Sequence, residues 1–165
     1  MMLDTFPPHV IALQHEDFIE LRSTLFIGLL IIDLKHGTIL LQPDCPDNEL
    51  GEAVLKALAA FKVVPAEERA AVKKLSKDED WYGQWIEERM ARFGYKRKGQ
   101  LFKRLYSCSI RNTEGELIIR PSNHDQLEGW SGLGDSEEVH IPADSTPEEI
   151  GAALRLGFSR CWGRY

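Results

Sequence analysis

Two segments of this chain match without a gap at a spacing of 100 positions: PDNELGEAVLKAL at 46–58 and TPEEIGAALRLGF at 146–158. The clearest matched pairs are Asp44 with Asp144, Glu49 with Glu149, Leu50 with Ile150, Gly51 with Gly151, and Ala53 with Ala153. Two copies are too few for a solenoid. The repeat therefore indicates two helices that are laid on one sheet in equivalent ways.

Each copy has the signals of a strand, an Asp-containing turn and a capped helix. The extended segments TILLQPD and EVHIPAD precede the two copies. In the second copy, Thr146 and Glu149 have capping-box spacing and Pro147 suits the first helical position. In the first copy, Asp47 is the expected N-cap. We therefore predict helices that begin within about two residues of Asn48 and Pro147.

The remaining segments predict two hairpins and two further helices. An Ile- and Leu-rich run at 24–34, a KHG turn and a second run at 38–43 predict one hairpin, and LYSCSI and ELIIRP around RNTEG predict the other. Helices are predicted for PAEERAAVKKL and DEDWYGQWIEERMARFGY. The face expected to be buried in the latter is formed by Tyr82, Ile86, Met90 and Phe93. The glycine-rich segment EGWSGLGDSEE has no periodicity and is predicted to be a loop.

Together these elements predict a single α+β domain over residues 1–165, with a central, mainly antiparallel sheet and packed helices. Three cysteines without CxxC spacing do not form a disulfide framework, which favours the cytoplasm. The N-terminus lacks the basic and apolar regions of a signal peptide. The most apolar stretch is interrupted by Asp33, Lys35 and Gly37, so we expect buried strands there and no membrane span.

Charge is distributed unevenly along the chain, whose net charge is −6. Eight basic residues and no acidic residue occur from Arg89 to Arg111. From Asn112 to Glu149, ten acidic residues stand against the single basic Arg120, which gives a net charge of −9. Such an acidic segment suits a basic partner, whereas the mildly acidic total disfavours general nucleic-acid binding.

The residues that most resemble catalytic groups do not form a reactive arrangement. Ser122, His124 and Asp125 are too close in sequence to form a triad, and no GxSxG motif accompanies them. Cys108 lies in a predicted strand, where a buried, inert thiol is expected. The histidines lack metal-ligand spacing, and GWSGLG lacks the context of a dinucleotide-binding loop. We therefore expect no enzyme activity, no cofactor and no metal.

Three segments resemble the immunity proteins of bacterial contact-dependent growth inhibition (CDI) systems: LFKRLYSCSI, IIRPSNHDQLEGWSGLG and VHIPADSTPEEIGAALRLGFSRC. The resemblance extends over residues 20–161, and PDNELGEAVLKAL fits its first half. It implies a cytoplasmic protein that binds and neutralises the C-terminal toxin domain of an effector delivered by neighbouring bacteria, often a nuclease. Binding would occlude the toxin's active site.

The resemblance carries over no interface residues, so we selected these from charge and residue type. Asp135, Glu137 and Glu138 are the expected acidic contacts, in a loop that is free to adapt, with Trp130 or Trp81 as an apolar anchor. Two other functions remain open at this point. One is RNA binding through the basic segment from Arg89 to Arg111, and the other is a small hydrolase that uses His124.

Overall fold

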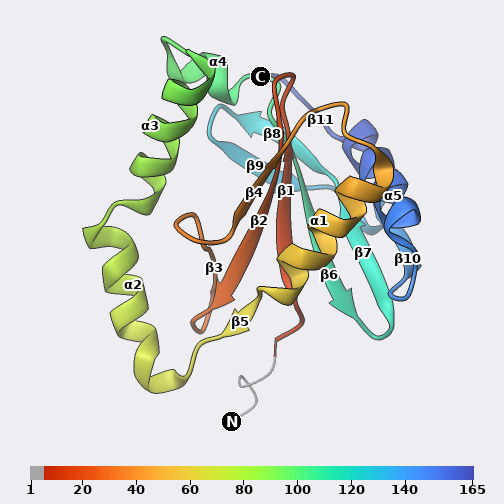
Figure 1. Cartoon of the computed structure of the whole chain (residues 1–165), viewed down its shortest axis with the longest axis horizontal. Helices are drawn as coiled ribbons and strands as arrows, with labels where there is room; N and C mark the ends of the chain where they lie inside the picture. Colours follow the sequence, from red (N-terminus) through yellow and green to blue (C-terminus); the bar gives the residue numbers. More distant parts are fainter. Residues whose placement is uncertain (1–5) are drawn as a thin grey trace.

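The computed structural model describes residues 6–165 and has one large, mainly antiparallel sheet, flanked by helices and joined by a smaller sheet (Figure 1). Along its main path the large sheet has the order β10-β7-β6-β1-β2-β3, and β4 and β5 also pair with β2. Its strands are β1 (His9–Gln14), β2 (Ile19–Phe26), β3 (Leu30–Ile32), β4 (Thr38–Leu41), β5 (Lys62–Val63), β6 (Tyr106–Thr113), β7 (Glu116–Arg120) and β10 (Val139–Pro142). The predicted α+β class is confirmed.

The other elements are helices and a three-stranded sheet of order β11-β8-β9. The helices are α1 (Asp47–Ala59), α2 (Arg69–Asp78), α3 (Trp81–Phe93), α4 (Lys98–Phe102) and α5 (Pro147–Arg160), with the 3-10 turns η1 (Ala66–Glu68) and η2 (Asp135–Glu137). The small sheet contains β8 (Ser122–Gln126), β9 (Gly129–Gly132) and β11 (Trp162–Gly163). Within residues 6–165, no helix is both long and apolar enough to cross a membrane.

The two copies of the repeat form α1 and α5, which pack against each other on one face of the sheet (Figure 1). The helices begin at Asp47 and Pro147, and each follows a strand, β4 or β10, as predicted. Gly51 and Gly151 lie where the helices cross. A β-carbon on Gly51 would come within 1.8 Å of the Pro147 carbonyl oxygen, and one on Gly151 within 1.9 Å of the Asp47 carbonyl oxygen. The glycines that match in sequence are thus the contact points of a two-fold-like helix crossing.

The starts of the two helices differ in how they are capped. The predicted capping box of α5 is present: Thr146 Oγ1 accepts from the Glu149 amide at 3.2 Å, and Glu149 accepts from the Thr146 amide at 3.0 Å. Asp47 does not cap α1. The N-cap position is Pro46, without a side-chain cap, and Asp47 instead accepts from Arg155 Nε at 2.8 Å. The Asp47 prediction was therefore wrong, because a partner on α5 holds the carboxylate.

Thr146→Ala is expected to lower the free energy of unfolding by about 1 kcal/mol, because the Glu149 amide loses its acceptor. Urea unfolding followed by circular dichroism measures the change. Thr146→Ser is the matched control, since it keeps the hydroxyl group and should remain close to the wild-type midpoint. Equal midpoints for the Ala and Ser variants would show that the capping hydrogen bond contributes no stability.

The opposite face of the sheet is covered by α3 and α4, around a second core of Leu13, Phe18, Trp85, Leu101 and Phe102. The buried face of α3 differs from the prediction. It contains Trp81, Trp85, Ile86 and Arg89, while Tyr82 is exposed and hydrogen-bonds to Glu128. The cause is a buried carboxylate on β2, Glu20, towards which Arg89 and the Trp85 indole N–H are turned.

Two other local predictions were wrong. The run at 24–34 is not one strand, because β2 ends at Phe26. Strands β3 and β4 do not pair with each other, and each pairs with β2 instead. The segment predicted as a glycine-rich loop contains β9 and η2. Strand β9 pairs antiparallel with β8. Hydrogen bonds between the two strands therefore make the segment extended, although its sequence has no strand periodicity. The β6–β7 hairpin around RNTEG is confirmed.

Candidate functional site

The residues expected at a partner interface do not all reach the surface. Trp81 at the start of α3 has only 6% of its surface exposed, and its ring lies edge-on to His36. Trp130 on β9 is half-buried, donates to the Leu105 carbonyl oxygen at 2.7 Å and stacks on His124. Trp81 is therefore not an exposed anchor. The exposed tryptophan is Trp162, at 58%, which the sequence analysis did not select because it lies outside the quoted motifs.

The three expected acidic contacts also have different environments. The carboxylate of Asp135 is 90% exposed and makes one ion pair, at 3.0 Å with Arg120. Glu137 is exposed in η2. Only 4% of the Glu138 side chain is exposed, and its carboxylate accepts from Arg120 Nε at 3.0 Å and Arg111 Nη1 at 3.3 Å. Glu138 is therefore a structural residue, and the expectation that all three lie in a freely adaptable loop was wrong.

The electrostatics around Glu138 agree with this role. Burial alone would raise the pKa of the Glu138 carboxyl. The hydrogen bond from Arg120 and the charges of Arg111 and Arg120 outweigh burial, so the pKa is lowered. The carboxylate therefore stays ionised at neutral pH and holds the start of β10 against β6 and β7.

A larger acidic surface arises from the repeat itself. Helices α1 and α5 cross near their first turns, and six acidic residues in or next to those turns are exposed. We call these residues the acidic helix-pair face: Asp44, Glu49, Glu52, Asp144, Glu148 and Glu149. Within the part of the chain from residue 6 onward, none of the six carboxylates forms a salt bridge. These six carboxylates are therefore not neutralised by a salt bridge to the described residues.

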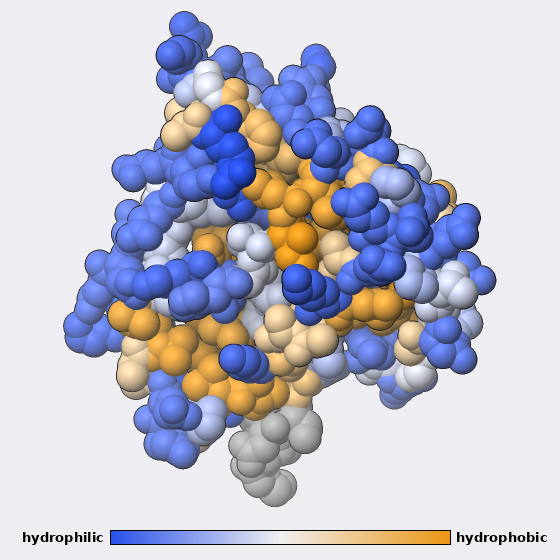
Figure 2. Space-filling view, in the orientation of Figure 1, coloured by the Kyte–Doolittle hydropathy of each residue, from blue (hydrophilic) through white to orange (hydrophobic). Residues whose placement is uncertain are grey.

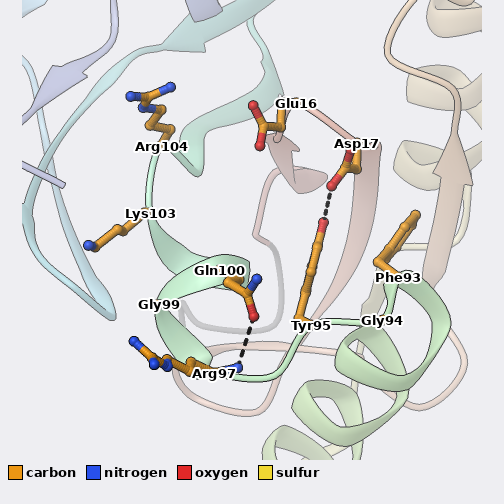
Figure 3. A pocket seen from close by; sticks show the side chains of 10 residues that line it. All are labelled: Glu16, Asp17, Phe93, Gly94, Tyr95, Arg97, Gly99, Gln100, Lys103 and Arg104. Carbon is orange, nitrogen blue, oxygen red and sulfur yellow. Dashed lines mark hydrogen bonds between the residues drawn. The ribbon is translucent and has the colours of Figure 1, made fainter.

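A pocket of about 570 Å³ lies between the β1–β2 turn and the α3–α4 corner (Figure 3). Arg97, Lys103 and Arg104 line the α4 side, and Glu16 and Asp17 line the other. The Tyr95 hydroxyl donates to Asp17 Oδ2 at 2.5 Å. Burial, followed by this hydrogen bond, raises the pKa of Tyr95, so the phenol stays protonated and keeps donating.

This pocket accounts for only part of the basic segment from Arg89 to Arg111. Four of the eight cations are held by internal carboxylates, namely Arg89 by Glu20 and Glu88, Arg92 by Glu88, Lys98 by Glu128 and Arg111 by Glu138. Lys96, Arg97, Lys103 and Arg104 have no salt bridge to the described residues. Arg104 also has a left-handed backbone, with φ of 56°. The segment is thus partly a structural ion-pair network, which leaves a short cationic rim.

An apolar groove of about 360 Å³ lies where β5 leads into α2. It is lined mainly by Leu25, Val63, Val64, Val72 and Leu75. Figure 2 shows apolar surface in this region, bordered by hydrophilic side chains. Leu75 is among the most exposed large apolar residues, at 47%. Trp81 also lines this groove, and the sequence signal for the groove was Leu75 on a mostly polar helix.

The candidate catalytic residues are engaged in structural contacts. Ser122 donates to the Ser107 carbonyl oxygen, His124 Nε2 bonds the Leu127 carbonyl oxygen at 2.7 Å, and Asp125 accepts from Ser131. They therefore do not form a triad. Cys108 is fully buried, and a hydrogen bond with Cys161 together with burial raises its pKa. Among residues 6–165, no group of three or more His, Cys, Asp or Glu side chains is arranged to hold a metal ion.

Two solved structures are similar to this chain over nearly its whole length. One is a protein of unknown function, NMB0488, from Neisseria meningitidis, with a TM-score of 0.87 and 29% identity, covering 98% of this chain and 99% of the other. The second is the CdiA-CT/CdiI toxin and immunity complex from Yersinia pseudotuberculosis. In that complex the matched chain has a TM-score of 0.82 and 28% identity, with 95% of this chain and 98% of the other covered.

Sequence comparison gives a consistent assignment. The immunity protein CdiI-YPIII of Yersinia pseudotuberculosis serotype O:3 (strain YPIII) is 37% identical over 135 residues, covering 73% of this chain and 76% of the relative. The family model CdiI, described as CDI immunity protein, matches residues 9–161. That match spans both copies of the repeat, the ion-pair network and the pocket, and the chain therefore belongs to the CDI immunity protein family.

Proposed function

We propose that this protein binds the C-terminal toxin domain of a CDI effector in the cytoplasm and neutralises it, without catalysing a reaction. The match of the CDI immunity protein family to residues 9–161 carries this proposal. The likeness to the matched chain of a toxin and immunity complex supports it. The engagement of Ser122, His124 and Cys108 in structural contacts favours binding over hydrolysis.

We further propose that the toxin domain is a basic nuclease whose active site is covered in the complex. The support is charge: the acidic helix-pair face and the exposed carboxylates of η2 suit a surface that attracts phosphate. Occlusion of this kind requires about 1,600 Å² of total buried area and an apolar centre. The groove beside α2 is a candidate for that apolar centre.

RNA binding through the basic segment is the second candidate, because three cations, Arg97, Lys103 and Arg104, line the pocket shown in Figure 3. Two observations place it behind toxin binding. Half of the segment's cations are held by internal carboxylates, and the pocket also carries Glu16 and Asp17, whose charges repel phosphate.

The test is binding of the purified protein to the toxin domain encoded beside it, together with protection of cells that express that domain. We expect a one-to-one complex whose association rate falls as salt rises. Asp135→Lys with Glu137→Lys should slow association roughly tenfold at low salt. Glu138 is left unchanged, because its reversal would break the ion pairs with Arg111 and Arg120.

The matched control is Asp78→Lys with Glu87→Lys, which makes the same charge change at exposed positions of α2 and α3 that do not line the groove. Equal slowing in both double variants would indicate a general charge effect and would contradict an interface at η2. A wild-type protein that neither binds nor neutralises its neighbouring toxin would contradict the proposed function itself. In that event, binding to single-stranded RNA, lost on Lys103→Glu with Arg104→Glu, would support the second candidate.

A further inference from the structure

Two of the three cysteines are in contact in the core between the large sheet and helices α1 and α5. Cys108 is buried in the middle of β6, and Cys161 is the residue that ends α5. Their sulfur atoms lie 3.6 Å apart, although the residues are 53 positions apart in sequence. Cys45 is buried elsewhere, beside Arg155. The chain thus holds one close thiol pair and one separate thiol.

Gly157 allows the two sulfur atoms to approach each other. A β-carbon at this position would lie 3.4 Å from Cys108 Sγ and only 2.7 Å from Ile119 Cγ2. Without a side chain there, the last turn of α5 packs directly onto β6 and β7. Closing a disulfide, with a bond of about 2.0 Å, then requires the sulfur atoms to approach by only about 1.5 Å.

The two thiols differ in ways that would give them different roles. Cys108 is fully buried, whereas Cys161 is partly exposed. The hydrogen bond with Cys108 lowers the pKa of Cys161 against the opposing effect of burial, and the same contact raises the pKa of Cys108. Since the thiolate is the reactive form, Cys161 is the sulfur that an oxidant would reach first and that would attack it.

We propose that Cys108 and Cys161 are a reversible dithiol–disulfide site, oxidised by hydrogen peroxide. The Cys161 thiolate attacks one peroxide oxygen, so that an S–O bond forms, the O–O bond breaks, and the departing hydroxide takes up a proton as water. Cys108 then attacks the Cys161 sulfur, the S–S bond forms, and the oxygen leaves as a second water with the Cys108 proton. The two sulfurs together lose two electrons, and the peroxide gains them.

The crosslink would tie the end of α5 to the centre of the main sheet. The loop it closes runs from β6 through β7, both strands of the β8–β9 hairpin, η2, β10 and α5. Closing that loop lowers the conformational entropy of the unfolded chain, which raises the stability of the folded state relative to it. The same end of α5 also contacts η2, because Arg160 Nη1 donates to the Glu137 carbonyl oxygen at 3.0 Å.

The experiment treats the folded, full-length protein with hydrogen peroxide and measures intact mass, a non-reducing peptide map and the urea midpoint. We expect the loss of two hydrogen atoms, a peptide pair joined through Cys108 and Cys161, and a higher midpoint that returns to its starting value with dithiothreitol. Cys45→Ser should behave as the wild type. Cys161→Ser and Cys108→Ser should form no crosslink and show no shift in midpoint on oxidation.

Three results would overturn the proposal. The first is a gain of oxygen at Cys161 without a crosslink, the second is a disulfide between two molecules, and the third is an unchanged mass under conditions that oxidise a free thiol peptide. Circular dichroism of each variant before oxidation establishes that it is folded. If a serine variant does not fold, the intact mass and the peptide map of the wild-type protein decide whether the Cys108–Cys161 crosslink forms.

Discussion

Gly51→Ala is expected to destabilise the protein by about 3 kcal/mol, at the upper end for overpacking of a core. The added methyl group would lie 1.8 Å from the Pro147 carbonyl oxygen, a backbone atom that cannot move without its helix. Relief therefore requires α1 and α5 to separate, which loosens the apolar contacts between both helices and the sheet. Urea unfolding followed by circular dichroism measures the loss.

Gly134→Ala is the matched control, because a β-carbon there meets no atom within 4 Å and its φ is −68°. It should leave stability within about 0.5 kcal/mol of the wild type. Gly151→Ala should cost about as much as Gly51→Ala. The double variant should cost less than the sum, since helices that have already separated accommodate the second methyl group. Full additivity would show that the two glycines do not share one crossing.

Glu20→Ala is expected to cost about 3–5 kcal/mol, which is the range for removing one partner of a buried ion pair. The carboxylate of Glu20 is fully buried and accepts from Arg22 Nε and Arg89 Nε, both at 2.7 Å, and from Trp85 Nε1. Burial already lowers the pKa of Arg22, and the charge of Glu20 opposes that effect. Without Glu20, the buried Arg22 guanidinium would lose its carboxylate partner, and Arg89 would keep only its pair with Glu88.

Glu88→Ala is the matched control, since Glu88 also pairs with Arg89, but from the surface. Its side chain is 43% exposed, and exposed pairs contribute at most about 1 kcal/mol. The comparison therefore separates the cost of a buried charge from the loss of one contact to Arg89. If both variants have the same urea midpoint, water reaches the cluster in solution and the Glu20 carboxylate is not a buried anchor.

The repeat and the turns were predictable because they depend on local signals. Thr146, Pro147 and Glu149 define the start of α5 within four residues, and RNTEG defines the β6–β7 turn. Asp47 shows the limit of this reasoning. Its position before a helical segment is typical of an N-cap, but the Arg155 guanidinium on α5, 108 residues away, holds its carboxylate.

The buried polar cluster could not be predicted for a similar reason. A glutamate and an arginine in IELRS are typical of a solvent-facing strand edge, and the partner that keeps Glu20 inside the protein is 69 residues away on α3. That distant partner also rotates α3, so that Trp81 and Trp85 are buried in place of Tyr82. Glu138 was assigned to the surface for the same reason, although Arg111 and Arg120 enclose it.

The spacing of the helix crossing also affects how the chain folds. Gly151 is 100 positions after Gly51, so the two can meet only once that stretch has been synthesised, and contacts between distant residues close slowly. While the chain is still emerging from the ribosome, the apolar side of α1 has no partner from α5 to cover it. At about 5–20 residues per second, this interval lasts several seconds in each round of translation. During that time chaperones have access to the uncovered apolar side of α1.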